Sequence, residues 1–330
     1  MLAYFVRRFQ YALLLLIAVS LVSFIIIQLP PGDYLTTVIQ NMRDAGQSDE
    51  DIRLRVEALQ RRYGLDQPLY VQYGRWVWGL LHGDMGYSFQ WQQPVESLIG
   101  ERIVLTMVVS FTTIVFTWVV AFPIGVYSAT HQYSPLDYVF TFVAFVGIAI
   151  PDFLLALFLA YALYRLTGMS VIGLFSPEYA TAPWSLGRVW DLIKHMGVPI
   201  AIVGAAGTAG LVRTLRACIL DELGKPYVTA ARARGLSEWQ LLLRYPIRIA
   251  INPLLSTVGY MLPGIVSGTV IVSVVLGLPM TGPLLLRALT FQDMYLAASF
   301  VMLLSGLTVV GTFISDLLLA WADPRIRLAS

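Results

Sequence analysis

The stretch DELGKPYVTAARARGLSEWQLLLRYPIRIAINP, residues 221–253, is the most polar segment in the second half of the sequence. Strongly apolar segments flank it on both sides. A largely apolar chain has little reason to keep so long a polar loop unless a surface outside the membrane contacts it. The fold that we predict depends on the apolar segments around this stretch and on the secondary structure that its own residues can form.

The composition predicts an all-α integral membrane protein that crosses the bilayer several times. Of 330 residues, 57% are hydrophobic and 13% are charged, whereas soluble domains are about 45–50% apolar and about 25% charged. The net charge of +2 and the dispersed basic residues argue against a nucleic-acid partner. A single cysteine, Cys218, excludes an intrachain disulfide and a thiolate metal cluster.

The N-terminal apolar run, residues 9–29, is long enough to cross a membrane. About 20 residues of helix span roughly 30 Å of hydrocarbon, and a cleaved signal peptide has a shorter apolar core. Arg7 and Arg8 precede the run. We therefore interpret residues 1–29 as a cytoplasmic start followed by an uncleaved first transmembrane helix.

Residues 30–102 form a polar region that we place on the external side of the membrane. The region contains seven arginines and ten acidic residues, and segments longer than about 60 residues translocate largely regardless of charge. Ser48 is placed to cap a helix that continues to Tyr63. An aromatic cluster then indicates a segment along the membrane interface. Its members are Tyr70, Tyr73, Trp76 and Trp78.

Residues 103–330 contain five further apolar segments. We predict membrane helices at about residues 103–130, 138–166, 193–218, 252–275 and 294–322. Six crossings place both termini in the cytoplasm. Between residues 213 and 248, around the polar stretch that this topology assigns to the inner side, seven basic residues outnumber three acidic ones, as the positive-inside rule requires.

Two features of these helices are candidates for a transport path. Pro151 and Asp152 fall in the middle of the third helix, where a carboxylate is costly and usually faces a cavity or a partner. Asp152 either lines the path or is a neutral, hydrogen-bonded acid packed between helices. Gly204, Gly207 and Gly210 fall on nearly one face of the fourth helix, which favours close helix packing. A gating hinge is the alternative role for these glycines.

The polar stretch predicts two short helices separated by a turn at Gly235. Alanine and arginine are good helix formers, and a glycine readily ends a helix. Ser237 can cap the second helix, whose apolar residues Trp239, Leu242 and Leu243 fall on one face. The result is a helix–turn–helix, at about residues 218–250, that lies along the inner membrane surface.

The first of these short helices resembles a known family signature. The pattern Tyr-Val-x-x-Ala-x-Ala-Arg-Gly-Leu, at residues 227–236, resembles the EAA loop of binding-protein-dependent ABC importer permeases. Four other segments are similar to the oligopeptide and dipeptide permease branch. They are Pro31-Gly-Asp33, Tyr63-Gly-Leu-Asp-Gln-Pro68, Gly83-Asp-Met-Gly86-x-Ser88 and Asp323-Pro-Arg-Ile-Arg327. The resemblance therefore covers nearly the whole chain.

The resemblance implies a type I ABC importer permease fold, in which this loop couples the chain to a cytoplasmic ATPase. The coupling helix would dock in a cleft of that ATPase. The residues assigned to the coupling loop are Tyr227, Thr229, Ala230, Ala231, Arg232, Arg234, Gly235 and Leu236. Thr229 stands where the family motif has a glutamate.

The resemblance also implies partners and a solute. The partners are a second, related permease subunit, two ATPase subunits that hold ATP and Mg, and an external solute-binding protein. The chain would form half of a translocation pathway in the cytoplasmic membrane of a bacterium or archaeon. The implied solute is an oligopeptide or dipeptide. An oligosaccharide or nickel is the alternative, because residues 273–282 lack the Glu-x-x-Phe-x-x-Pro-Gly-x-Gly pattern of many peptide permeases.

The sequence lacks the motifs that would make this chain an enzyme by itself. No Gly-x-x-x-x-Gly-Lys-Ser/Thr is present to hold phosphates, so we expect this chain to bind no cofactor and to take its energy from a partner. The absence of His-Glu-x-x-His and Gly-x-Ser-x-Gly argues against an intramembrane enzyme. A secondary transporter that works without ATP would explain Asp152 but would leave the arginine-rich loop without a task.

Overall fold

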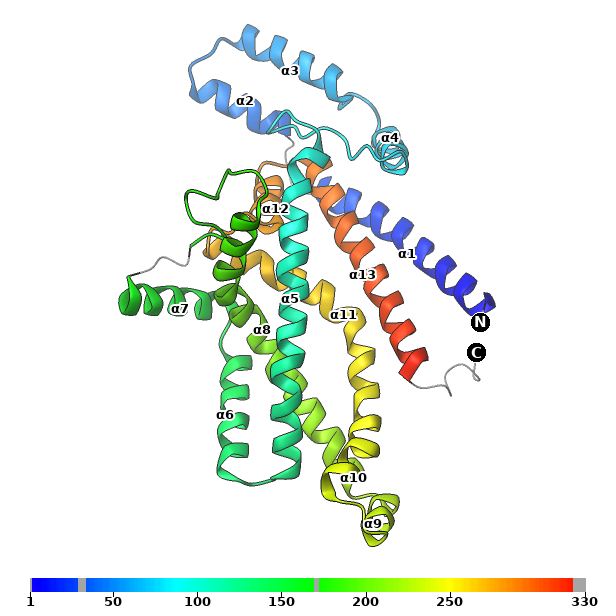
Figure 1. Cartoon of the computed structure of the whole chain (residues 1–330). Coiled ribbons are helices and arrows are strands. Elements are labelled where there is room, and N and C mark those ends of the chain that lie inside the picture. Colours follow the sequence, from blue (N-terminus) through cyan, green and yellow to red (C-terminus); the bar gives the residue numbers. More distant parts are fainter. Residues whose placement is uncertain (1, 29–33, 169–171, 323–330) are drawn as a thin grey trace. The chain divides into compact units, whose positions relative to one another are not determined.

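The computed structural model of the protein describes residues 2–28, 34–168 and 172–322 (Figure 1). In these residues the regular structure is thirteen helices, with one isolated β-bridge between Tyr87 and Pro94. The helices are α1 (Leu2–Gln28), α2 (Tyr34–Asp44), α3 (Asp49–Tyr63), α4 (Leu69–Leu81), α5 (Val95–Thr130), α6 (Pro135–Ala149), α7 (Asp152–Thr167), α8 (Leu186–Leu223), α9 (Pro226–Ala233), α10 (Glu238–Arg244), α11 (Pro246–Val275), α12 (Thr281–Thr290) and α13 (Met294–Ala322). The predicted all-α class is confirmed. The motif segments at 31–33 and 323–327 lie outside the described residues.

The chain divides into two compact units. The core unit comprises Leu105–Met280 and Leu307–Ser330, and the N-terminal unit comprises Leu2–Val104 and Thr281–Gly306. Helices α5 and α13 each contribute residues to both units. The division into residues 1–29, 30–102 and 103–330 concerns membrane topology and stays a prediction.

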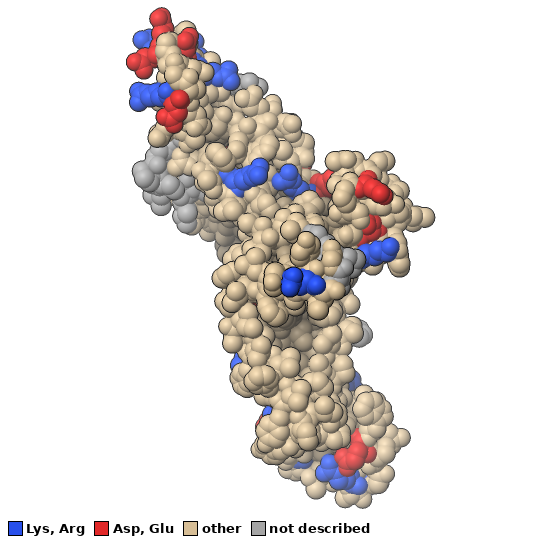
Figure 2. All heavy atoms as spheres, turned by 90° about the vertical axis from the view of Figure 1, so that its left-hand side faces the viewer, with Lys and Arg blue, Asp and Glu red and all other residues tan. Residues whose placement is uncertain are grey.

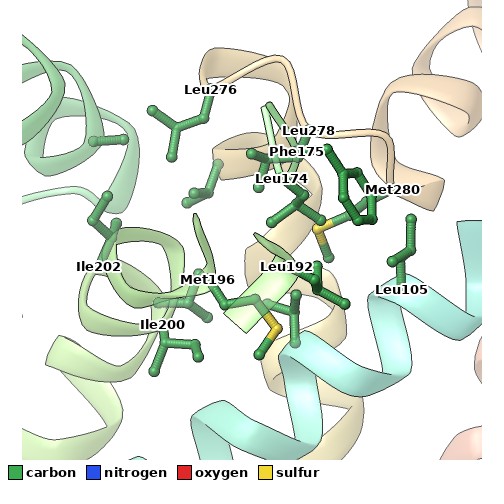
Figure 3. Close-up of a cluster of buried hydrophobic side chains, with 14 residues drawn as sticks. Leu105, Leu174, Phe175, Leu192, Met196, Ile200, Ile202, Leu276, Leu278 and Met280 are labelled. Atoms are coloured by element: carbon green, nitrogen blue, oxygen red, sulfur yellow. The ribbon is translucent and has the colours of Figure 1, made fainter. Parts of the chain in front are cut away.

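Helix α8 is the central helix of the core unit, where it packs against α6, α7 and α11. An apolar cluster surrounds its first half and includes Leu192 and Met196 (Figure 3). The loop before α8 adds Phe175 to this cluster, and the segment after α11 adds Leu278 and Met280. The loops next to these helices are therefore fixed by apolar packing.

A second apolar cluster surrounds the later part of α8. Leu215 and Ile219 are fully buried there. Ala121 of α5, Leu242 of α10 and Leu254 of α11 pack into the same cluster. Helix α8 thus connects the interior of the core unit to the two short helices that follow it.

The third predicted helix, residues 138–166, is wrong as a single helix. Helices α6 and α7 are bent by 108° relative to each other at the break between them, and in Figure 1 α7 leaves the end of α6 sideways. Ile150 is extended (φ −89°, ψ 123°), because a residue that precedes a proline avoids the helical conformation. Pro151 is extended as well (φ −59°, ψ 139°), and α7 starts directly after it.

A buried ion pair fastens the start of α6 to α8. Arg216 donates from Nε to Asp137 Oδ1 at 3.0 Å and from Nη2 to Asp137 Oδ2 at 2.9 Å. The Asp137 side chain is 3% exposed and also accepts the backbone N–H of Tyr133 at 3.0 Å. Ser134 caps the same helix, since its hydroxyl accepts the Asp137 N–H. A bidentate charge-assisted pair fixes orientation as well as distance.

The N-terminal unit packs around a cluster of aromatic side chains. The buried members are Phe24, Tyr63, Trp76 and Phe89. Trp76 Nε1 donates to Ser299 Oγ at 3.2 Å, and Ser299 in turn donates to the Met85 carbonyl at 2.9 Å. These bonds join α4, the loop after it and the start of α13.

The predictions for residues 30–102 are confirmed in part. Helix α3 follows Ser48, whose hydroxyl accepts the Asp51 N–H at 3.2 Å, as the cap predicts. The predicted interface cluster divides into two sets. Tyr70 and Trp78 are 77% and 67% exposed, whereas Trp76 is 2% exposed because it packs into the aromatic cluster.

All six predicted apolar segments occur, although not all as full-length spans. Among the described residues, α5, α8 and Met294–Ser315 of α13 are long and apolar enough to cross a membrane. The α6–α7 pair is a fourth span if it counts as one, and shorter apolar helices occur at Phe9–Ile25 and Gly264–Val275. Helices α5, α8 and α11 begin before their predicted starts, and the predicted loop 276–292 contains α12.

The contact between α5 and α8 predicts that Gly125→Ala lowers stability. A Cβ on Gly125 would lie 2.9 Å from Leu215 Cδ2 and 3.1 Å from Leu215 Cβ, and Leu215 is fully buried. We expect a loss of about 1–3 kcal/mol, measured as a lower Tm of the detergent-solubilised protein. Gly100→Ala on the same helix meets no atom within 4 Å and is the matched control. Equal Tm values for the two variants would contradict the close contact.

The buried ion pair predicts a large loss of stability for Asp137→Ala. The variant leaves Arg216 without its charge partner, and because the Arg216 side chain is 26% exposed we expect a cost of about 2–3 kcal/mol. Glu57→Ala, which breaks the exposed Arg53–Glu57 pair of α3, should cost about 1 kcal/mol or less. The double variant Asp137→Ala/Arg216→Met should have a higher Tm than Asp137→Ala. A double variant that unfolds as early as the single one would show that the pair is not the cause.

Candidate functional site

Two short helices follow α8 in the core unit and form the predicted helix–turn–helix (Figure 1). Helix α9 begins with Pro226 directly after the extended residue Lys225 (φ −75°, ψ 146°), a position that suits the fixed φ of proline. Helix α10 follows Ser237, which is also extended. The Ser237 carbonyl accepts the Leu241 N–H at 2.9 Å, but its hydroxyl makes no capping bond. Ser237 therefore takes the cap position without the side-chain bond that the sequence predicts.

The turn between the two helices is a Schellman motif. Gly235 has φ 82°, and its N–H donates to the Arg232 carbonyl at 3.0 Å. The Leu236 N–H donates to the Ala231 carbonyl at 3.4 Å. These two bonds satisfy carbonyls at the end of α9, and the left-handed conformation favours glycine. The predicted role of Gly235 in ending the helix is confirmed.

A small apolar cluster holds α9 and α10 together from beneath. Val228 and Leu241 are fully buried, and Ala231 is 5% exposed. Leu236 and Tyr245 pack against these three residues. The side chains that join the two helices are therefore on the inner face of the pair, and the outer face is free of them.

A bidentate ion pair closes the outer side of the turn. Arg232 donates from Nε to Glu238 Oε1 at 2.6 Å and from Nη2 to Glu238 Oε2 at 3.0 Å. The hydrogen bonds from Arg232 lower the pKa of Glu238 below its usual value. The two side chains are 50% and 61% exposed. This pair is not among the predictions from the sequence, although an arginine and a glutamate on either side of a helix-ending glycine would have indicated it.

Two further contacts fix α9 to the end of α8. The Tyr227 hydroxyl donates to the Glu222 carboxylate, and Lys225 Nζ lies 3.1 Å from Asp221 Oδ2. Burial and the bond to Glu222 together raise the pKa of Tyr227 to about 12. Tyr227 therefore stays protonated, and remains a donor, throughout the physiological pH range.

The predicted coupling residues divide between an outer and an inner face. Thr229, Ala230 and Arg234 are exposed, whereas Ala231 is buried and Leu236 is half-buried. Figure 2 shows charged side chains of both signs over the α9–α10 end, whereas the surface over the apolar helices carries few. The outer face of α9 thus carries the small side chains of Thr229 and Ala230 bordered by charges, which lets another protein approach the backbone closely.

The three apolar residues that the sequence places on one face of α10 differ in burial. Leu242 is 7% exposed and packs into the second apolar cluster of the core unit. Trp239 and Leu243 are 63% and 49% exposed. Leu241, the neighbour of Leu242, is buried as well. Helix α10 lies between two apolar clusters, and Leu241 packs into one while Leu242 packs into the other.

The structure separates the two candidate features of the transport path. Asp152 lies in the first turn of α7, and not in the middle of a helix as predicted. The free backbone N–H groups of a first turn favour a carboxylate. The half-buried Asp152 side chain faces α11, where its Oδ2 lies 3.7 Å from the position of a Cβ on Gly268.

The glycines of α8 face α5, and so they do not meet Asp152. A Cβ on Gly204 would lie 3.0 Å from Phe116, and a Cβ on Gly207 would lie 3.6 Å from Thr117. No atom lies within 4 Å of a Cβ on Gly210. Gly204 and Gly207 therefore leave room on α8 for the Phe116 and Thr117 side chains of α5, and Gly210 has open space beside it.

Known sequence families match most of the chain. Residues 121–328 match the family described as binding-protein-dependent transport system inner membrane component, and residues 1–112 match the N-terminal region of such membrane components. The oligopeptide transport system permease protein AppB of Bacillus subtilis is 32% identical over 328 residues, 99% of this chain and 100% of the relative. The oligopeptide transport system permease protein OppB of Mycobacterium bovis is 30% identical over 278 residues, 83% of this chain and 85% of the relative.

A solved structure has a similar fold. A chain of the MetNI methionine ABC transporter, in an inward-facing conformation, aligns with a TM-score of 0.52 at 16% sequence identity. The alignment covers 68% of this chain and 96% of that chain. The chain therefore belongs to the family of inner membrane components of binding-protein-dependent transport systems, as a multi-pass ABC importer permease with the type I permease fold.

Proposed function

We propose that this chain is the transmembrane subunit of an ATP-driven importer and forms half of its translocation pathway. The observation that carries this proposal is the α9–α10 pair with its small exposed side chains, Thr229 and Ala230. The Schellman turn at Gly235 and the Arg232–Glu238 pair hold these helices in one shape. A rigid, exposed element of this kind suits docking in a cleft of a separate ATPase.

The proposal includes an orientation and a set of partners. Helices α9 and α10 and both termini would lie in the cytoplasm. Two ATPase subunits would hold ATP and Mg, so this chain would need no cofactor of its own. A second permease subunit, either a different chain or a second copy, would complete the pathway. An external binding protein would deliver the solute.

The core unit offers a route by which movement of α9 and α10 reaches the membrane helices. Helix α9 continues from α8, and α10 leads into α11 after Tyr245. Helices α8 and α11 pack against each other, so a push on the short helices acts on both. The Asp137–Arg216 pair extends the same movement to α6.

We propose a peptide as the solute. The relatives AppB and OppB are named as oligopeptide transport system permease proteins. In the segment that departs from the peptide-permease pattern, residues 273–282, six of the ten residues are buried. Leu276, Leu278 and Met280 are each 1–2% exposed. Packing therefore accounts for its apolar sequence without a different solute.

Gly235→Val is expected to reduce ATP-driven uptake without preventing assembly. A β-branched side chain is strained at φ 82°, although a Cβ there would meet no atom within 4 Å. The turn must change shape, and we expect uptake in proteoliposomes to fall about tenfold, since left-handed backbone costs about 1–2 kcal/mol. Co-purification of the ATPase subunits measures assembly, and ATP hydrolysis per solute transported measures coupling.

Gly46→Val is the matched control for this experiment. Gly46 has φ 74° and equally open surroundings, but it lies between α2 and α3 in the N-terminal unit. Gly235→Asn should retain most of the uptake, because asparagine tolerates the left-handed conformation. Normal uptake by an assembled Gly235→Val complex would refute the coupling role of the turn.

Deleting this chain from its native cell is expected to abolish ATP-dependent uptake of some labelled peptides and to leave oligosaccharide uptake unchanged. The measurement supplies a mixture of isotopically labelled di- to pentapeptides and quantifies each by mass spectrometry. Wild-type protein should restore uptake, and Gly235→Val should restore it only weakly. Loss of labelled oligosaccharide uptake, with peptide uptake intact, would show that the solute is an oligosaccharide and not a peptide.

A further inference from the structure

A cavity of about 490 Å³ lies within the N-terminal unit. Its size falls within the range of about 300–1,000 Å³ typical of small-molecule pockets. Segments that are distant in the sequence line it together. Tyr63 comes from the end of α3, Arg75 and Trp76 from α4, Asp84 from the following loop, Glu96 from the start of α5 and Tyr295 from the start of α13.

The walls of this cavity are fixed by buried contacts. Trp76 is 2% exposed and bonded to Ser299, and the Tyr63 ring lies 4.8 Å from the Phe89 ring. Gly86 has φ 88°, and a Cβ there would lie 3.0 Å from the Tyr295 ring. The loop therefore lies directly on Tyr295, and the cavity is a built feature of the unit.

Two of the motif segments that the proposed function leaves unexplained meet at this cavity. Tyr63 begins the segment at 63–68, and Asp84 and Gly86 belong to the segment at 83–88. Asp84 Oδ1 accepts the Gly86 N–H at 2.8 Å, which shapes the loop at the cavity wall. The two segments thus combine to present one charged, aromatic surface.

The cavity presents charges of both signs. Arg75, Asp84 and Glu96 are exposed, and the part of the chain that the structure describes contains no ion pair for any of them. All three line the same cavity as Tyr295. The cavity therefore has one guanidinium and two carboxylates beside tyrosine and tryptophan rings.

This arrangement suits a ligand that carries both charges. Arg75 would repel a purely cationic ligand, and the carboxylates of Asp84 and Glu96 would repel a purely anionic one. A free peptide has an ammonium group at one end and a carboxylate at the other. Arginine binds carboxylates through paired donors, while carboxylates and aromatic faces both attract an ammonium group.

We propose that this cavity binds free peptides, with the terminal ammonium group near Asp84 and Glu96 and the terminal carboxylate near Arg75. The proposal rests on the proposed function, and it gives the N-terminal unit a direct role in receiving the solute. Exposed ion contacts each contribute little, so binding is weak and reversible, with a dissociation constant of about 1 mM. Weak binding suits a site from which the solute must move on.

The test uses dialanine as the probe and the full chain in lipid nanodiscs. Ligand-observed NMR titration measures its dissociation constant without a binding protein or ATP. N-acetyl-dialanine lacks the ammonium group, and dialanine amide lacks the carboxylate. We expect each blocked form to bind about fivefold more weakly, the factor that one exposed ion contact provides.

Variants assign each penalty to its residues. In Arg75→Gln, dialanine amide should bind as well as dialanine, because the carboxylate has lost its partner. N-acetyl-dialanine should still bind more weakly than dialanine. Asp84→Asn/Glu96→Gln should do the reverse, and asparagine keeps an Oδ1 acceptor for the Gly86 N–H. Arg53→Gln and Glu57→Gln on α3 change an exposed ion pair of the same unit and should alter neither penalty. The Tm of each variant confirms that it is folded.

Two results would overturn the proposal. One is equal affinity for dialanine and its blocked forms, and the other is a blocking penalty that the folded cavity variants leave unchanged. Peptide uptake separates this failure from failure of the proposed function. If the chain restores peptide uptake to the deletion cell but shows either result, the proposed importer function stands and only the proposed binding site is refuted.

Discussion

The pairing of Asp137 with Arg216 limits how the core unit can move. Separating the two groups would leave a buried charge without a partner, at a cost of several kcal/mol. Helices α6 and α8 are therefore held together at the end of α8 that leads into α9. A displacement of α9 and α10 reaches α6 through this pair and reaches α11 through direct packing. Helices α6, α8 and α11 are thus joined to one another at the end of the core unit that carries α9 and α10.

The α9–α10 pair is held rigid by one set of side chains and exposes another. Its rigidity comes from buried side chains, Val228, Ala231 and Leu241, and from the backbone bonds around Gly235. Its exposed surface carries small and charged side chains together with Trp239 and Leu243, and none of these contributes to the buried cluster. Ala231 and Ala230 are adjacent in the sequence, yet one belongs to the interior and the other to the surface. Residues of a single motif can thus serve two physical purposes.

Features of this fold that depend on neighbouring residues could be predicted from the sequence. Contacts between residues far apart in the sequence could not. The Ser48 cap, the turn at Gly235 and the bounds of α13 follow from neighbouring residues alone. The break between α6 and α7 was missed because a proline by itself does not decide it. Pro123 and Pro199 lie inside the continuous helices α5 and α8. The signal at the break is the pair Pro151-Asp152, since an aspartate after a proline favours the start of a new helix. No local rule identifies the Asp137–Arg216 pair, whose members are 79 residues apart.

The helix contacts of the core unit differ in how firmly polar bonds hold them, and this difference indicates where the unit can move. Helices α6 and α8 are joined by two charge-assisted hydrogen bonds. Helices α7 and α11 meet where the Asp152 carboxylate lies beside Gly268, and among the described residues no hydrogen bond holds that carboxylate. The start of α7 stabilises Asp152 whether or not α11 stays beside it. Separating Asp152 from α11 would therefore break no hydrogen bond to its carboxylate, whereas separating α6 from α8 would break two.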